Sequence, residues 1–70
     1  MKVNVIRSKM TLLGMSQAKV ADKMGISVNT MSSRMQGHTS FTLKEVARLC
    51  EILEIQDPEE QKDIFFTAAS

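Results

Sequence analysis

Apolar residues recur along the chain at spacings that suit helices. Near the start, Ile6, Met10 and Leu13 stand at positions i, i+4 and i+7, which share one face of a helix. The β-branched residues are scattered and do not alternate with polar ones, as they would in half-buried strands. The pattern therefore predicts an all-α chain. Its first helix covers residues 4–13 and stops at Gly14, because glycine enters the left-handed conformation without strain.

Polar residues that favour helix N-termini precede each later apolar repeat. The predicted helices cover residues 17–24, 28–36, 43–54 and 58–66, and we expect the tail at 67–70 to fray. Their predicted N-caps are Ser16, Ser27, Thr42 and Asp57. Glu45 follows Thr42 at the spacing of a capping box, and Pro58 suits the first position of a helix. The result is five short helices in one compact domain, residues 1–70.

The same periodicity predicts which side chains form the core. In the second and third helices they are Val20, Ala21, Met24, Met31 and Met35, and in the fourth they are Leu43, Val46, Ala47, Cys50 and Leu53. We also expect Phe41 to pack inward, together with Ile64 and one of the adjacent pair Phe65 and Phe66. Cys50 is then a small buried apolar residue rather than a nucleophile.

Composition limits the chemistry available to the chain. Its 70 residues include one cysteine and one histidine, so we predict neither an internal disulfide nor a structural zinc site. There is also no nucleophile–base pairing and no phosphate-cradling glycine loop, so we predict no enzyme activity, no cofactor and no small-molecule substrate. No apolar run is long enough to span a membrane, and we expect a cytoplasmic protein.

The net charge of +1 conceals an uneven distribution. Residues 1–38 carry six lysines and arginines against one acid, whereas residues 39–70 carry three against seven acids. One half would be attracted to phosphates and the other repelled by them, although an ordinary solvated surface also explains such a pattern.

Residues 17–36 have the spacing of two helices joined by a sharp turn. Ala21 is small where the helices would cross, and Gly25 stands where the chain must turn. Ile26 and Met31 then anchor the following helix. Such a turn holds two helices at a steep angle and leaves the second protruding, so that it can enter a major groove about 12 Å wide.

The outward face of that second helix carries short, uncharged side chains. With Met31 and Met35 turned inward, the outward residues are Val28, Asn29, Ser32, Ser33 and Gln36. Asparagine can pair with adenine, serine with several base edges, and valine can contact a thymine methyl group. No acid occurs between Gly25 and Phe41, which suits a surface that meets phosphates.

Further residues extend this pattern on both sides, in a fixed order. They are Ser16-Gln17, Val20-Ala21, Met24-Gly25-Ile26-Ser27, Met31, Gly37 and Phe41-Thr42-Leu43-Lys44-Glu45. Over roughly residues 4–55 the chain resembles the helix-turn-helix family of lambdoid phage Cro and repressor proteins, the Cro/CI or XRE-type family. The stretch from Gly37 looks most like the short regulators of prophages and mobile elements in Gram-positive bacteria. The resemblance implies a lambda-repressor-like fold with its helix-turn-helix at about residues 17–36, and a homodimer that binds a double-stranded DNA operator.

The resemblance also implies roles for individual residues. The base-reading positions are Val28, Asn29, Ser32 and Ser33. The phosphate-contacting candidates are Gln17, Ser27, Thr30, Arg34, Gln36, His38, Thr39 and Ser40. Many members carry a glutamate and an arginine where this chain has Met35 and Met10, so a buried contact between methionines would replace an ion pair. Arg34 occupies a place that is often aliphatic, and its stem could cover the core while its head reaches a phosphate.

Two functions from different classes fit these observations. The first is sequence-specific DNA binding by a transcriptional regulator, a phage-type repressor or a Cro-like protein. The second is a protein-interaction module of the same fold, such as an antirepressor, an adaptor or an antitoxin, with little DNA affinity of its own. The low net charge favours the second, and the outward face of residues 28–36 favours the first.

Overall fold

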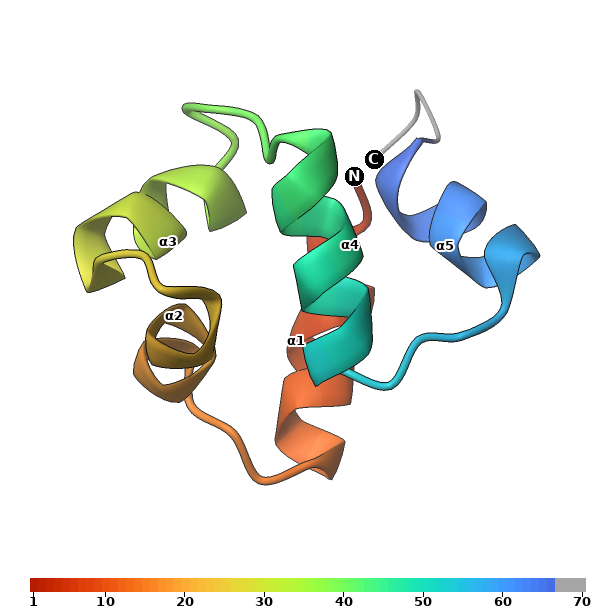
Figure 1. Cartoon of the computed structure of the whole chain (residues 1–70), viewed down its shortest axis with the longest axis horizontal. Helices are drawn as coiled ribbons and strands as arrows, with labels where there is room; N and C mark the ends of the chain where they lie inside the picture. The colour runs from red at the N-terminus through yellow and green to blue at the C-terminus, as the bar shows by residue number, and fades with distance from the viewer. Residues whose placement is uncertain (67–70) are drawn as a thin grey trace.

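Five α-helices make up most of residues 1–66, the part of the chain that the computed structural model describes (Figure 1). They are α1 (Val3–Leu12), α2 (Gln17–Met24), α3 (Val28–Met35), α4 (Leu43–Ile52) and α5 (Pro58–Phe65). The all-α prediction with five helices is therefore confirmed, with ends shifted by one or two residues. The prediction of a frayed tail concerns residues 67–70, which lie outside the described part. None of the helices in residues 1–66 has the length and apolar character needed to cross a membrane.

All four predicted helix caps are present. The hydroxyl oxygens of Ser16, Ser27 and Thr42 accept hydrogen bonds from the backbone N–H three residues on, at 3.0–3.1 Å. Asp57 Oδ1 accepts from the N–H of Glu59 at 3.1 Å. Each cap satisfies an N–H group that has no partner within its helix, which explains why the helices begin where the sequence places their caps.

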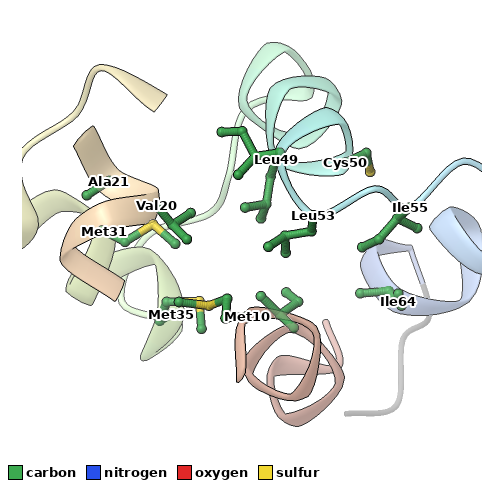
Figure 2. Packing of buried hydrophobic residues seen from close by; sticks show 12 residues of the cluster. Met10, Val20, Ala21, Met31, Met35, Leu49, Cys50, Leu53, Ile55 and Ile64 are labelled. Carbon is green, nitrogen blue, oxygen red and sulfur yellow. The ribbon is translucent and has the colours of Figure 1, made fainter. Parts of the chain in front are cut away.

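The core lies where the five helices meet. Ile6 and Met10 from α1, Val20 and Ala21 from α2, and Met31 and Met35 from α3 are all buried. Met10 and Met35 point toward one another in this cluster, in agreement with the predicted methionine contact (Figure 2). Because both side chains are unbranched and flexible, they can fill this space without the polar partners that a buried ion pair would need.

The prediction of which α4 side chains face the core is partly wrong. Cys50 and Leu53 are buried as expected, but Leu43 is 75% exposed and Ala47 is exposed as well. The buried stripe is instead centred on Leu49 and Leu53, which point into the middle of the cluster (Figure 2). Apolar residues cover so much of this helix that two stripes fit its periodicity, and the positions of the neighbouring helices select one of them. Burial raises the pKa of the Cys50 thiol, as expected for a side chain that packs as a small apolar group.

Helix α5 packs against the N-terminal segment and α1. The N–H of Lys2 donates to the carbonyl oxygen of Ile64 at 2.8 Å, and Ile64 is buried. Two ion pairs join the same elements, Lys2 with Asp63 at 2.9 Å and Lys9 with Glu60 at 3.1 Å. Glu60 and Asp63 are thus paired with lysines of α1 and of the segment before it, and α5 lies on the opposite side of the molecule from α3 (Figure 1).

Candidate nucleic-acid interface

The turn between α2 and α3 is built from three residues with separate tasks. Gly25 adopts the left-handed conformation, with φ +73°, and ends α2. The N–H of Ile26 then donates to the carbonyl oxygen of Ala21 at 3.1 Å, and Ser27 caps α3. Ala21 is fully buried and Ile26 packs against the core, so the predicted spacing corresponds to a real helix crossing. Helix α3 runs across α2 at the edge of the molecule (Figure 1).

The outer face of α3 presents the side chains that the sequence predicts. Met31 and Met35 are buried, whereas Val28 is 52% exposed and Asn29 is exposed. The Asn29 amide has no hydrogen-bond partner among residues 1–66, so both its donor and its acceptor are available to a ligand. Ser32 and Ser33 are half-buried beside them. We call Val28, Asn29, Ser32 and Ser33 the outer face of α3.

Hydrogen bonds between side chains extend this polar surface past the end of α3. Gln36 Nε2 donates to Ser32 Oγ at 3.1 Å, and Gln36 Oε1 lies 3.0 Å from His38 Nε2. On the next turn, Ser33 Oγ and Thr39 Oγ1 share a hydrogen bond of 3.2 Å. The structure therefore brings predicted base-reading and phosphate-contacting residues together in two hydrogen-bonded groups, one through Ser32 and one through Ser33.

The remaining predicted phosphate contacts lie at helix N-termini and in the loop after α3. Ser27 donates its hydroxyl proton to Thr30 Oγ1 at 2.9 Å while it caps α3. Gln17 is the first residue of α2 and is half-buried. Ser40 is exposed, in the loop formed by residues 37–41, which we call the 37–41 loop.

Arg34 differs in one respect from the sequence-based expectation. Its side chain is partly covered, as predicted, but its guanidinium lies against Glu45, with Nε 2.9 Å from Oε1 and Nη2 3.2 Å from Oε2. The hydrogen bond with Arg34 is the main cause that lowers the pKa of Glu45, and a second bond from the N–H of Thr42 lowers it further. The same pairing raises the pKa of Arg34. The positive charge of Arg34 is thus compensated within the protein.

Sequence reasoning missed this role of Glu45. The capping-box spacing predicted only its bond to the N–H of Thr42, which is present at 3.0 Å. Arg34 is eleven residues away in the chain, and no helical periodicity connects the two positions. The one feature of the sequence that could have indicated an ion pair here is Arg34 itself, a charged residue at a position that is often aliphatic.

Several cations on the two helices that precede and follow α3 have no ion pair in the described part of the chain. They are Lys19 and Lys23 on α2 and Lys44 in the first turn of α4. By contrast, Lys2 and Lys9 are paired with acids of α5. Among residues 1–38, the charged side chains without an ion pair in the described part of the chain are therefore Lys19, Lys23 and Asp22 on α2 and Arg7 on α1. No group of three or more histidine, cysteine or acidic side chains that could hold a metal ion occurs in residues 1–66.

Among the comparisons with known proteins, the one with protein-family models found a match. The helix-turn-helix family model HTH_3 matches residues 6–59, which include α2, α3 and α4 entirely. Comparisons with curated proteins and with solved structures gave no match. The matched region includes the turn at Gly25 and the outer face of α3. The chain therefore belongs to the helix-turn-helix family of the XRE, Cro and CI type, a non-enzymatic family of DNA-binding domains.

Proposed function

We propose that this protein binds double-stranded DNA at specific sequences and regulates transcription as a phage-type repressor or a Cro-like protein. The observation that carries the proposal is the outer face of α3, where Val28 and Asn29 are exposed and Ser32 and Ser33 half-buried, on the side away from the buried Met31 and Met35. An ordinary surface helix would carry long charged side chains here, and these would obstruct the approach to base edges. The absence of acids from Gly25 to Phe41 removes repulsion from phosphates over the same surface.

In this proposal, base recognition belongs to the outer face of α3. Asn29 is suited to a paired contact with adenine, because its amide offers a donor and an acceptor that have no partner among residues 1–66. Val28 supplies an apolar contact for a thymine methyl group. Ser32 and Ser33 reach base edges that accept or donate single hydrogen bonds.

Phosphate contacts surround this face and supply affinity rather than specificity. The proposed residues are Gln17, Ser27, Thr30, Gln36, His38, Thr39 and Ser40. Arg34 is a weaker candidate for a direct contact because Glu45 neutralises it. Lys19, Lys23 and Lys44 add long-range attraction from the neighbouring helices.

We further propose that the protein acts as a homodimer on a pseudo-palindromic operator. Two copies of α3 would enter successive major grooves about 34 Å apart, as in dimeric helix-turn-helix proteins. The prophage and mobile-element regulators of Gram-positive bacteria, which the sequence resembles, are the expected setting. The protein would then act in the cytoplasm, and the whole chain of residues 1–70 would serve as one DNA-binding domain.

Selection of bound sites from random double-stranded DNA tests the proposal directly. We expect a symmetric motif with two half-sites one helical turn apart, and we expect the Val28→Ala/Asn29→Ala double variant to lose or alter it. An Asn4→Ala variant on α1, which changes an exposed asparagine elsewhere, should select the same motif as the wild type. Failure to enrich any sequence would contradict specific recognition.

A protein-interaction module of the same fold is the second candidate, and the net charge of +1 favours it. A salt titration separates the two functions. A DNA-binding protein should lose affinity linearly in the logarithm of salt concentration. Absence of DNA binding even at low salt, together with a folded protein, would favour the interaction module.

A further inference from the structure

The carboxylate of Glu45 joins two helices, α3 and α4, on either side of the 37–41 loop. Glu45 Oε1 accepts from Arg34 Nε of α3 at 2.9 Å and from the N–H of Thr42, at the start of α4, at 3.0 Å. Glu45 Oε2 accepts from Arg34 Nη2 at 3.2 Å. Glu45 therefore connects the last turn of α3 to the first turn of α4, and the 37–41 loop lies between these two anchors.

The connection continues from Arg34 into the loop itself. Arg34 Nη1 donates to Thr39 Oγ1 at 2.7 Å, and the same hydroxyl shares a hydrogen bond with Ser33 Oγ. Glu45, Arg34, Thr39 and Ser33 thus form a continuous chain of contacts. It begins at the α4 N-terminus, crosses the loop and ends on the outer face of α3.

Few backbone contacts hold the loop in place. The N–H groups of Gly37 and His38 donate to carbonyl oxygens of α3 at 3.2 and 3.0 Å. The N–H groups of residues 39–41 have no acceptor among residues 1–66. Between the backbone bonds of Gly37 and His38 and the packed ring of Phe41, Thr39 is joined to α3 by its side-chain bonds to Arg34 and Ser33.

The Arg34–Glu45 pair is also more enclosed than the other ion pairs of residues 1–66. Its side chains are 18% and 19% exposed, whereas the other three pairs range from 30% to 70%. Water competes less for an enclosed bidentate pair, so its geometry is better fixed than that of an exposed pair. A contact of this kind is suited to hold the loop in one position.

We infer that Glu45 is a positioning residue for DNA binding, which acts through Arg34 to fix the 37–41 loop against the outer face of α3. The inference rests on the proposed function and extends it to a residue that touches no DNA. Phosphate contacts from the loop and base contacts from α3 can form together only if the two surfaces keep a fixed spacing. Arg34 contributes here through its position, because its three guanidinium nitrogens are already engaged with Glu45 and Thr39.

A matched pair of variants isolates this role. Glu45→Gln removes the charge that binds Arg34, but glutamine can still form the capping box with Thr42. Glu51→Gln makes the same change of charge on the same helix, in the exposed pair with Arg48. Removal of an acid by itself should tighten DNA binding in both variants, and at least as much for Glu45, which lies nearer the proposed surface. Weaker binding by Glu45→Gln than by Glu51→Gln therefore reports on position rather than on net charge.

Binding to the selected operator is measured over a salt series at a temperature where both variants are folded. We expect Glu45→Gln to bind roughly tenfold more weakly than Glu51→Gln. We also expect a shallower salt dependence, by about one phosphate contact, because a displaced loop makes fewer such contacts. A merely destabilised protein would keep the salt slope. Binding by Glu45→Gln that equals or exceeds that of Glu51→Gln would overturn the inference.

Two further measurements separate this inference from the proposed function. In an Arg34→Met background, Glu45→Gln should have no further effect on affinity, because its action passes through Arg34. In the free protein, the amide hydrogen of His38 should exchange at least about tenfold faster in Glu45→Gln than in Glu51→Gln. If the wild type binds DNA and these differences are absent, only the positioning role fails. If the wild type binds no DNA, the proposed function fails and this inference fails with it.

Discussion

The ring of Phe65 meets the ring of Phe41 edge-on, with centroids 6.5 Å apart and planes at 90°. This contact joins α5 to the end of the 37–41 loop, and both rings pack against the buried core. The next residue, Phe66, is 57% exposed. Phe65 therefore packs against the core while Phe66 is exposed, because consecutive residues at a helix end cannot face the same core.

This difference predicts unequal effects on stability. Phe65→Ala should lower the free energy of unfolding by roughly 1–3 kcal/mol, since it removes a partly buried ring and its contact with Phe41. Phe66→Ala should change it by less than about 0.5 kcal/mol. Urea denaturation followed by circular dichroism measures both values. Equal losses in the two variants would show that the edge-on contact is not stabilising.

The turn between α2 and α3 should tolerate few residues at position 25. Gly25→Ala should destabilise the protein by about 1–2 kcal/mol, because alanine is strained at φ +73°. No atom lies within 4 Å of the added Cβ, so the loss comes from the backbone alone. Gly25→Asn should be milder, since asparagine tolerates the left-handed region better. Thermal denaturation of the two variants checks this order, and an alanine variant as stable as the wild type would refute it.

At Glu54 we expect a substitution by glycine to stabilise the protein, because this non-glycine residue has φ +60° just after α4. Glu54→Gly should raise the free energy of unfolding by about 0.5–1 kcal/mol, as relief of strain exceeds the entropy lost on folding. The same change at Glu51, inside α4, should lower it by about 1 kcal/mol. Chemical denaturation measures whether each variant has a higher or a lower free energy of unfolding than the wild type. A loss of stability at position 54 would show that its backbone is not strained.

The lowered pKa of Glu45 predicts a specific dependence of stability on pH. A carboxyl group with a lower pKa in the folded than in the unfolded chain stabilises the fold fully above its ordinary value of 4.5. This contribution is lost as the pH falls through the lowered pKa. We therefore expect the stability difference between the wild type and Glu45→Gln to be largest at neutral pH and to shrink in acid. Urea denaturation at pH 7 and at about pH 3 measures it, and a difference independent of pH would contradict the assigned ionisation.

Base recognition by Asn29 predicts a loss confined to the operator. Asn29→Ala should weaken binding to the selected site by about 1–3 kcal/mol and relax the base preference at one position in each half-site. Binding to random DNA should remain unchanged, because that affinity comes from phosphates. Parallel titrations with operator and random DNA check this expectation, with Asn4→Ala as the control. An equal loss on both DNAs would assign Asn29 to the backbone instead.

The amino-acid sequence by itself determined the local features of this protein. Ser16, Ser27, Thr42 and Asp57 cap their helices through bonds to residues two or three positions away, so their roles depend on nearby sequence alone. The turn at Gly25 is also local, because glycine adopts the left-handed conformation that ends α2. The inward direction of Met31 and Met35 is local as well, because residues four positions apart share one face of a helix. These local rules were sufficient to predict five helices and the exposure of Val28 and Asn29.

Only the tertiary structure decided the relationships between distant residues. The apolar residues of α4 allowed two buried stripes, and contact with the neighbouring helices selected Leu49 in place of Leu43. Packing against Phe41 decided which of Phe65 and Phe66 is covered. Arg34 found its partner on a different helix, so the arginine expected to reach a phosphate is held by Glu45. Periodicity describes one helix at a time, whereas burial and ion pairing depend on how helices approach each other in space.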